Sequence, residues 1–345
     1  MKFYRYTRFV EQSNSRDNIT VRRKLGQSGL EVASLGLGCV GLSNAYGPAD
    51  PAEAIATLHR ALDLGCNLLD TADLYGAGQN EILVGRAIRD RREQAVVATK
   101  FGFIFSDAGQ VLGRDASPAY VRQAVERSLT RLGIDTIDLY TLHRVDPNVP
   151  IEETVGAMAD LVAEGKIRGI GLSEVSADLL RRAHATHRIT ALQSEYSLWI
   201  REPEREILPA CLELEISFVA FAPLGRGLFS GTLAPEEFSE SDFRRSLPRF
   251  QPATLAKSQT LMGGLEDLAT RKHCTCSQLA LSWILQKGDH MFAIPGTRRQ
   301  KHLEENLAAM QIAWTASEMQ EMDRISEAHQ NLGERYAPGS PFASE

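Results

Sequence analysis

The sequence predicts an α/β protein folded as one (β/α)8 TIM barrel, with an N-terminal β-hairpin and two additional helices. Three observations support this fold class. From residue 35 onward, short apolar runs alternate with helical patterns of about 10 to 16 residues, which is typical of strand–helix units around a parallel sheet. Eight such runs can be counted, and no break near the middle of the chain separates two domains. A closed barrel is therefore favoured over an open doubly wound sheet.

The predicted strands are short runs of apolar and β-branched residues. They span 34–38, 66–70, 95–99, 136–142, 167–172, 190–195, 217–222 and 291–294. Helices between them have recognisable N-cap residues at Asp50, Ser117 and Ser176, whose side-chain oxygens can accept hydrogen bonds from free backbone N–H groups. A further helix is predicted over 277–287, where Gly288 ends it.

Three segments lie outside the eight units. Residues 22–32 are predicted to form a small hairpin that turns at 28–29 and plugs the bottom of the barrel. Helical patterns over 254–272 and 316–328 exceed the eight-unit count, so these helices are expected to pack outside the barrel. A single domain is thus expected over 21–330.

The ends of the chain are expected to stand apart from this domain, with 1–20 as a poorly ordered extension and 331–345 as a C-terminal tail. Residues 225–252, rich in Gly, Pro, Ser and charge, follow the seventh strand and are a candidate lid. Residues 36–41 match the G-x-G-x-x-G string of dinucleotide-binding folds, but a loop over 42–48 follows instead of a helix. The string is therefore a weak signal.

Composition indicates a small-molecule partner. The net charge of −6 and the isoelectric point near 5.8 argue against nucleic acid or an anionic membrane as the main partner, because these attract clustered Lys and Arg. No apolar stretch approaches the roughly 20 residues that span a bilayer. The five cysteines are odd in number and scattered without metal-site spacing, so we expect reduced thiols, no metal and a cytoplasmic protein. The sequence leaves the oligomeric state open.

Four polar side chains fall near the carboxyl ends of the second, third and fourth predicted strands: Asp70, Tyr75, Lys100 and His143. In a barrel of this type, one face collects the carboxyl ends and carries the active site. A tyrosine hydroxyl, with a pKa of about 10, is a poor proton donor at neutral pH unless a cation stabilises the phenolate. Lys100 can be that cation, held charged by Asp70. His143 offers a second donor to a carbonyl oxygen. Each residue alone is more often structural, but the four together predict carbonyl reduction.

The same residues and four later motifs resemble the aldo-keto reductase superfamily, over nearly all of 21–328. The motifs are Gly171-Leu172-Ser173-Glu174, Leu192-Gln193-Ser194-Glu195, Phe221-Ala222-Pro223-Leu224-Gly225-Arg226-Gly227 and Ile294-Pro295-Gly296-Thr297 with Glu305-Asn306. They are similar to the microbial and plant branch of NADPH-dependent aldehyde and ketone reductases. The resemblance implies that Tyr75 is the acid and that Asp70, Lys100 and His143 complete a catalytic tetrad.

The resemblance also implies NADPH, bound without a dinucleotide-binding domain. The implied cofactor-binding residues are Ser173, Glu174, Gln193, Phe221, Pro223, Leu224, Gly225, Arg226, Gly227, Thr297, Arg298, Arg299, His302, Glu305 and Asn306. Ser173 and Gln193 would bind the nicotinamide carboxamide, and Phe221 would stack on the ring.

The phosphates would lie further round the barrel. Backbone amides of Leu224, Gly225 and Gly227 would hold the pyrophosphate. The loop after the eighth strand would hold the 2′-phosphate at a helix N-terminus. Its donors would be Thr297, Arg298, Arg299 and His302. Glu305 and Asn306 would contact adenine.

Two positions depart from the common pattern. Glu174 stands where many members of the superfamily have Asn, which leaves the donor pattern at the carboxamide open. Arg144 directly follows His143, where it could offer charge to an acidic or phosphorylated substrate or pair with Asp146.

Substrate contacts are predicted from aromatic residues in loops. Tyr46, Phe101, Phe103, Phe105 and Trp199 could line an apolar mouth, although packing explains several of them equally well. Residues 335–338 could fold over that mouth.

The function expected from the sequence is NADPH-dependent reduction of aldehydes or ketones to alcohols, with Tyr75 as the proton donor. Three alternatives remain open. They are a dedicated pyridoxal-type reductase, a cofactor-sensing regulatory subunit of the same fold with little turnover, and a phosphate-binding barrel isomerase or lyase.

Overall fold

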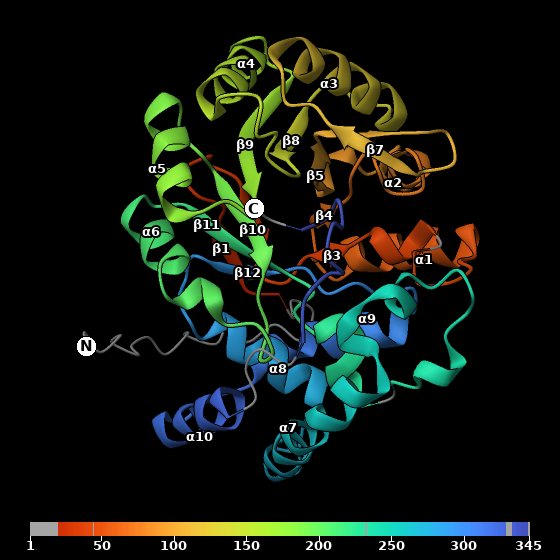
Figure 1. The fold of residues 1–345 in the computed structure, drawn as a ribbon, viewed down its shortest axis with the longest axis vertical. Helices are drawn as coiled ribbons and strands as arrows, with labels where there is room; N and C mark the ends of the chain where they lie inside the picture. Colours follow the sequence, from red (N-terminus) through yellow and green to blue (C-terminus); the bar gives the residue numbers. More distant parts are fainter. Residues whose placement is uncertain (1–19, 44, 232, 329–332, 344–345) are drawn as a thin grey trace.

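The computed structural model describes residues 20–43, 45–231, 233–328 and 333–343. Its main sheet has eight parallel strands in chain order. They are β3 (Leu37–Gly38), β4 (Leu68–Asp70), β5 (Val96–Phe101), β8 (Ile137–Leu142), β9 (Ile167–Ser173), β10 (Ala191–Glu195), β11 (Ser217–Phe221) and β12 (Met291–Ala293). Parallel bridges from Leu35 to Ala293 and from Gly38 to Gly296 join the first strand to the last. The sheet therefore curls into the predicted barrel (Figure 1).

Helices surround this sheet on its outside (Figure 1). They are α1 (Pro51–Asp63), α2 (Gln79–Ile88), α3 (Pro118–Leu132), α4 (Ile151–Ala163), α5 (Ala177–Thr186), α6 (Ile207–Glu213), α8 (Cys276–Leu285) and α9 (Gln300–Ala308). The predicted N-caps are confirmed, because Asp50, Ser117 and Ser176 each accept a hydrogen bond from a backbone N–H of the first turn. Helix α8 begins one residue earlier than predicted, since Thr275 and Gln278 form a capping box there.

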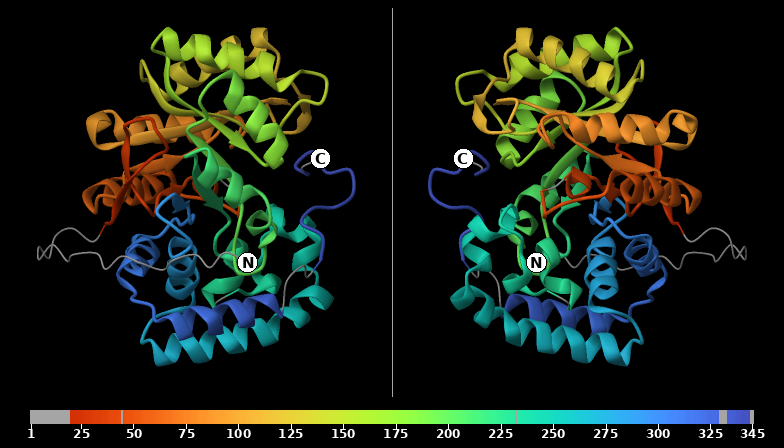
Figure 2. Two further views of the ribbon diagram at one scale, coloured as in Figure 1. Left: turned by 90° about the vertical axis from the view of Figure 1, so that its left-hand side faces the viewer. Right: turned by 90° about the vertical axis from the view of Figure 1, so that its right-hand side faces the viewer.

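The two additional helices are also confirmed. They are α7 (Pro252–Arg271) and α10 (Ala316–Glu327), which pack on each other along one side of the molecule (Figure 2). The described residues of the segment predicted as a lid, 225–231 and 233–251, contain only short 3-10 turns, and α7 begins at Pro252. The G-x-G-x-x-G string over 36–41 runs into a short 3-10 turn, Val40–Ser43, in place of the long helix that a dinucleotide-binding fold would begin there.

The predicted hairpin is present as β1 (Arg22–Lys24) paired antiparallel with β2 (Glu31–Ala33). Leu25 and Val32 are fully buried in a cluster with the barrel residues Leu68, Val96 and Phe292, so the hairpin plugs one end of the barrel as expected. A second hairpin, β6 (Phe103–Phe105) with β7 (Val111–Arg114), was not predicted. It follows β5 directly and lies next to the strand ends that carry the polar residues.

Three further expectations concern the N-terminal extension, membrane-spanning helices and metal sites. The extension predicted over 1–20 lies outside the described residues except for Thr20. In the described part of the chain, no helix is both long and apolar enough to cross a bilayer. The same residues contain no group of three or more His, Cys, Asp or Glu side chains suited to a metal ion, and all five cysteines are free.

Candidate active site

Three adjacent parallel strands bring the predicted tetrad together. Asp70 ends β4, Lys100 is the penultimate residue of β5, and His143 directly follows β8. Tyr75 lies in the turn between β4 and α2. Because β4, β5 and β8 are neighbours and run the same way, their carboxyl ends meet at one edge of the barrel.

Lys100 is the centre of this group. Its Nζ donates to Asp70 Oδ1 at 2.5 Å and to the Thr71 carbonyl oxygen at 2.9 Å, and it lies 3.4 Å from the Tyr75 hydroxyl oxygen. The Lys100 side chain is fully buried. An ammonium removed from water in this way stays charged only beside an anion, and Asp70 supplies one.

The pKa directions follow from these contacts. Burial lowers the pKa of Lys100, but Asp70 and Tyr75 together outweigh burial and the pKa ends above its ordinary value. Burial raises the pKa of the Tyr75 hydroxyl above its ordinary value, while Lys100 acts in the opposite direction. Lys100 therefore opposes the effect of burial, but the pKa of Tyr75 stays above that of a free tyrosine. Tyr75 carries its proton at neutral pH, and Lys100 is placed to stabilise the phenolate as the proton leaves.

His143 meets Tyr75 edge to face, with ring centroids 5.9 Å apart. Burial, followed by the charges of Lys100 and Arg144, holds the pKa of His143 well below its usual range, so the ring is neutral near pH 7. Its Nδ1 is buried and has no hydrogen-bond partner among the described residues. A neutral imidazole beside a phenol is suited to hydrogen-bonding a carbonyl oxygen.

The residues expected at the nicotinamide lie on the next three strands, β9, β10 and β11. Gln193 donates from Nε2 to Asp70 Oδ2 at 2.8 Å, so it also belongs to the tetrad's network. Ser173 is buried, and Phe221 at the end of β11 is half-buried. These neighbouring strand ends fit a planar ring with a polar carboxamide.

At the expected pyrophosphate site, two of the three predicted backbone amides make hydrogen bonds within the protein. The amides of Gly225 and Gly227 donate to the carbonyl oxygens of Ala222 and Leu224, so these two amides are already used in turns. The cause is a left-handed backbone at residues 225–227, which folds the chain back on itself.

At the expected 2′-phosphate site, the two arginines differ. Arg298 donates to the backbone carbonyl oxygens of Tyr46, Gly47 and Pro48 and so holds a loop. Arg299 is exposed at the N-cap of α9, and its backbone N–H donates to Thr297 Oγ1 at 3.1 Å. A cation at a helix N-terminus suits a phosphate, so Arg299 fits the group better than Arg298.

The remaining residues of this end lie on α9. His302 pairs with Glu305 across 3.5 Å, and Glu305 Oε1 accepts from the Thr275 hydroxyl at 2.8 Å. Asn306 is buried. Glu305 is therefore held by protein contacts on the face where adenine was predicted.

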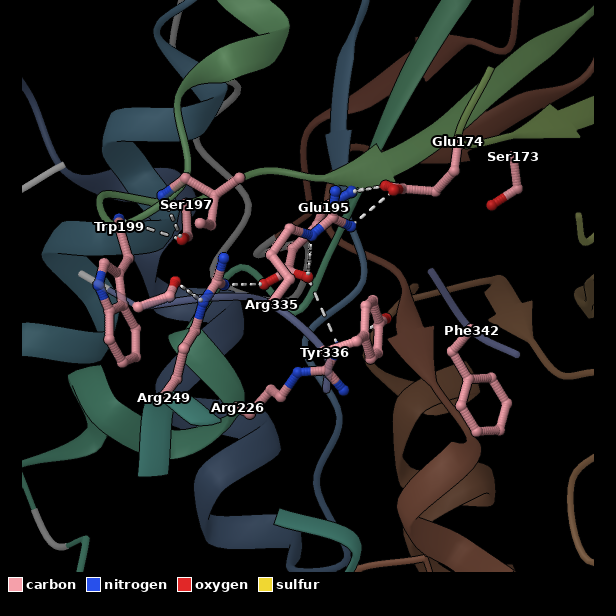
Figure 3. Close-up of polar contacts among 12 residues, drawn as sticks. Ser173, Glu174, Glu195, Ser197, Trp199, Arg226, Arg249, Arg335, Tyr336 and Phe342 are labelled. Carbon is pink, nitrogen blue, oxygen red and sulfur yellow. Dashed lines mark hydrogen bonds and ion pairs between the residues drawn. The ribbon is translucent and has the colours of Figure 1, made fainter. Parts of the chain in front are cut away.

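A buried cluster of charged residues at the barrel mouth was not predicted from the sequence (Figure 3). Glu195 at the end of β10 faces three guanidinium groups, with nearest distances of 2.9, 3.1 and 3.5 Å. They belong to Arg249, Arg335 and Arg226, in that order. Burial raises the pKa of Glu195, but these arginines outweigh it and the pKa ends below its ordinary value.

Glu174 belongs to the same cluster. One carboxylate oxygen accepts from the backbone N–H of Glu195 at 2.7 Å, and the other accepts from Arg335 at 2.6 Å. The Glu174 backbone has a left-handed φ of 56°, which turns the chain at the end of β9. This residue therefore anchors the C-terminal tail to the barrel, whereas the sequence placed it at the carboxamide.

The tail lies over the barrel mouth, as expected for 335–338 (Figure 3). The Tyr336 hydroxyl accepts from Arg226 at 3.0 Å. The ring centroid of Phe342 is 5.7 Å from that of Phe103, which in turn lies 5.1 Å from that of His143. Phe103 of β6 thus contacts both the tail ring of Phe342 and the His143 ring.

Two of the predicted mouth residues pack in the core instead. Phe101 is fully buried and stacks on Tyr140 at 4.6 Å, because it is the last residue of β5 and points into the core. Trp199 is 1% exposed, packing against Phe250 and beneath the Arg249 guanidinium. Tyr46 remains half-buried in its loop, 5.1 Å from the Arg244 guanidinium carbon.

Comparison with known proteins identifies the family. Residues 34–327 match the model of the aldo/keto reductase family. The chain belongs to that family. The resemblance seen in the sequence is confirmed, and this aldo/keto reductase is an oxidoreductase.

Solved structures of the same family share its fold. Glycerol dehydrogenase AKR11B4 from Gluconobacter oxydans is 29% identical with a TM-score of 0.81, over 89% of this chain and 95% of its own. Aldo-keto reductase AKR11C1 from Bacillus halodurans is 32% identical with a TM-score of 0.75, over 89% and 96%. An aldo/keto reductase from Klebsiella pneumoniae, in complex with NADP and acetate, is 27% identical with a TM-score of 0.71, over 91% and 99%.

Proposed function

We propose that this aldo/keto reductase uses NADPH to reduce an aldehyde or ketone to an alcohol, with Tyr75 as the proton donor. The observation that supports this most strongly is the 3.4 Å separation between the Lys100 ammonium and the Tyr75 hydroxyl, with Asp70 holding Lys100 in place. This arrangement suits a phenol that must lose a proton in a site removed from water.

Ser173, Gln193 and Phe221 would hold the nicotinamide of NADPH, which would supply a hydride for the carbonyl carbon. The neutral His143 ring hydrogen-bonds the carbonyl oxygen and orients it toward Tyr75. The Tyr75 hydroxyl gives its proton to that oxygen as negative charge develops there. Lys100 stabilises the resulting phenolate, and Asp70 keeps Lys100 protonated. In alcohol oxidation the same phenolate takes the proton back.

The preference for NADPH over NADH rests on the loop before α9. Arg299 is exposed there and Thr297 lies two residues earlier, so both can meet a 2′-phosphate at the helix N-terminus. The Klebsiella pneumoniae neighbours were solved with NADP and with NADPH, which supports the same choice for this chain.

The test follows the loss of NADPH absorbance with a panel of aldehydes and ketones. Wild-type protein is expected to turn over, and Tyr75→Phe is expected to lose most of the rate. A cofactor-sensing subunit would bind NADPH without sustained turnover. A barrel isomerase or lyase would leave NADPH untouched, so the assay separates the alternatives.

A further inference from the structure

Arg144 is a buried guanidinium without an ion-pair partner among the described residues. It is 4% exposed. Its Nη1 donates to the His143 carbonyl oxygen at 2.6 Å and to Ser173 Oγ at 3.1 Å, and its Nε donates to the Phe342 carbonyl oxygen at 3.1 Å. No ion pair joins Arg144 to Asp146 among the described residues, and Asp146 Oδ1 accepts from Asn148.

Two other arginines that are similarly buried form ion pairs with carboxylates. Arg201 and Arg249 are each 6% exposed, and they pair with Glu204 and Glu195 at 2.8 and 2.9 Å. A buried charge is costly unless an opposite charge balances it. Arg144 has only neutral acceptors, so its positive charge remains available to a ligand.

The position of Arg144 makes a substrate the natural ligand. The residue directly follows the catalytic His143, and its guanidinium spans from Ser173 to the tail residue Phe342, both visible at the mouth in Figure 3. The Phe342 ring approaches Phe103, and Phe103 approaches the His143 ring. The guanidinium therefore contacts the tail residue whose ring packs through Phe103 on the His143 ring. Its Nη2 has no acceptor in the described part of the chain.

We propose that Arg144 binds a carboxylate of the substrate, so that the preferred substrates are aldehydes or ketones that also carry a carboxylate group. This rests on the proposed function. Arg144 Nη2 supplies one N–H donor. Arg144 Nε supplies a second once it no longer donates to the Phe342 carbonyl oxygen. Two neighbouring donors match the two oxygens of a carboxylate. One unbalanced guanidinium matches a single negative charge, which favours a carboxylate over a phosphate dianion.

The test compares 4-carboxybenzaldehyde with its neutral methyl ester, methyl 4-formylbenzoate. For wild-type protein, kcat/KM is expected to be higher for the acid. In Arg144→Gln the ratio of acid to ester is expected to fall by about tenfold or more, mainly through KM, since a charged hydrogen bond is lost. Arg144→Lys keeps the positive charge but loses the paired donors of the guanidinium. Its acid-to-ester ratio is therefore expected to fall less than that of Arg144→Gln. Arg122→Gln, which removes an exposed guanidinium on α3 that pairs with Asp160 and Glu164, is the control and is expected to keep the wild-type ratio.

Binding of an unreactive acid gives a second readout. Calorimetric titration with benzoate, with and without NADP+, is expected to show binding to wild-type protein and at least tenfold weaker binding to Arg144→Gln, with benzamide bound weakly by both. Equal ratios in wild type and Arg144→Gln, or equal benzoate affinities, would overturn the proposal. If Arg144→Gln does not fold, the Arg144→Lys ratio decides.

The two proposals fail in different ways. If neutral aldehydes are reduced but the acid is no better than the ester, the carboxylate site is wrong and the reductase stands. If no carbonyl consumes NADPH, the reductase is wrong, and the benzoate titration still decides whether Arg144 binds a carboxylate.

Discussion

The Lys100 ammonium lies 2.5 Å from the Asp70 carboxylate, and their side chains are 0% and 5% exposed. The two residues come from neighbouring strands, so the barrel itself sets their separation. Removing one partner of such a pair leaves a buried charge without compensation. The pair therefore links the stability of the barrel to the proposed proton transfer from Tyr75.

Lys100→Met is expected to lower stability by about 3–5 kcal/mol, because Asp70 loses its partner. The double variant Asp70→Asn/Lys100→Met removes both charges and is expected to recover most of that stability. Neither variant is expected to recover turnover, since the cation beside Tyr75 is gone in both. Urea denaturation and steady-state rates measure the two effects separately. Turnover near the wild-type rate in the double variant would show that Tyr75 needs no cation.

Asp73 is expected to give the protein an unusual pH dependence of stability. It is 3% exposed, and its Oδ1 has no partner among the described residues. Burial and then the nearby Glu81 raise the pKa of Asp73 well above its usual value of 3.8. Above about pH 4 the unfolded chain loses the Asp73 proton, while the folded chain keeps it. Asp73 therefore lowers the free energy of unfolding increasingly as the pH rises toward its pKa in the folded protein.

Asp73→Asn removes that cost. The variant is expected to be more stable than wild type at pH 7, by an advantage that grows with pH by up to about 1.4 kcal/mol per unit and disappears near pH 4. Urea denaturation at several pH values measures it, with the exposed Asp107→Asn as the control. A difference that is flat with pH would contradict the raised pKa.

Arg299 and Arg298 should differ in their effect on cofactor choice. Arg299→Ala is expected to weaken NADPH binding by about tenfold or more and to change NADH binding little, because the missing contact is to the 2′-phosphate. Arg298→Ala instead frees the carbonyl oxygens of residues 46–48, so any loss is expected to be similar for both cofactors. Fluorescence titration with each cofactor measures this. Equal losses of affinity for NADPH and NADH in Arg299→Ala would show that Arg299 does not bind the 2′-phosphate.

Arg335 anchors the tail through Glu174 and Glu195. Arg335→Gln is expected to free the tail and to speed chymotrypsin cleavage after Tyr336 and Phe342. The barrel is expected to stay folded, because Glu195 keeps two other arginines. Arg181→Gln, which breaks an exposed pair with Glu213, is the control. Unchanged cleavage at both aromatic residues would show that other contacts hold the tail.

The barrel and the tetrad could be predicted from the sequence because both depend on local patterns. Each strand is a short apolar run, and the observed strands β3 to β12 of the barrel fall on the predicted runs with shifts of a few residues at their ends. Asp70, Lys100 and His143 lie at or next to strand ends, so the fold places them together once the strands are found.

The missed features depend on contacts between distant segments. Glu195 was part of a quoted motif, but its partners Arg249 and Arg335 lie 54 and 140 residues away along the chain. The β6–β7 hairpin has partly exposed strands without a strong alternating pattern. Phe101 was misplaced for the opposite reason. It stands next to Lys100, but successive strand residues point to opposite faces.

The most direct test of the account is the rate of NADPH oxidation by Tyr75→Phe, measured with one good aldehyde alongside NADPH affinity. Phenylalanine keeps the ring beside His143 and removes only the hydroxyl that Lys100 faces. Turnover is expected to fall by about 10²–10⁴-fold, with NADPH affinity nearly unchanged. A variant that turns over at the wild-type rate would contradict it.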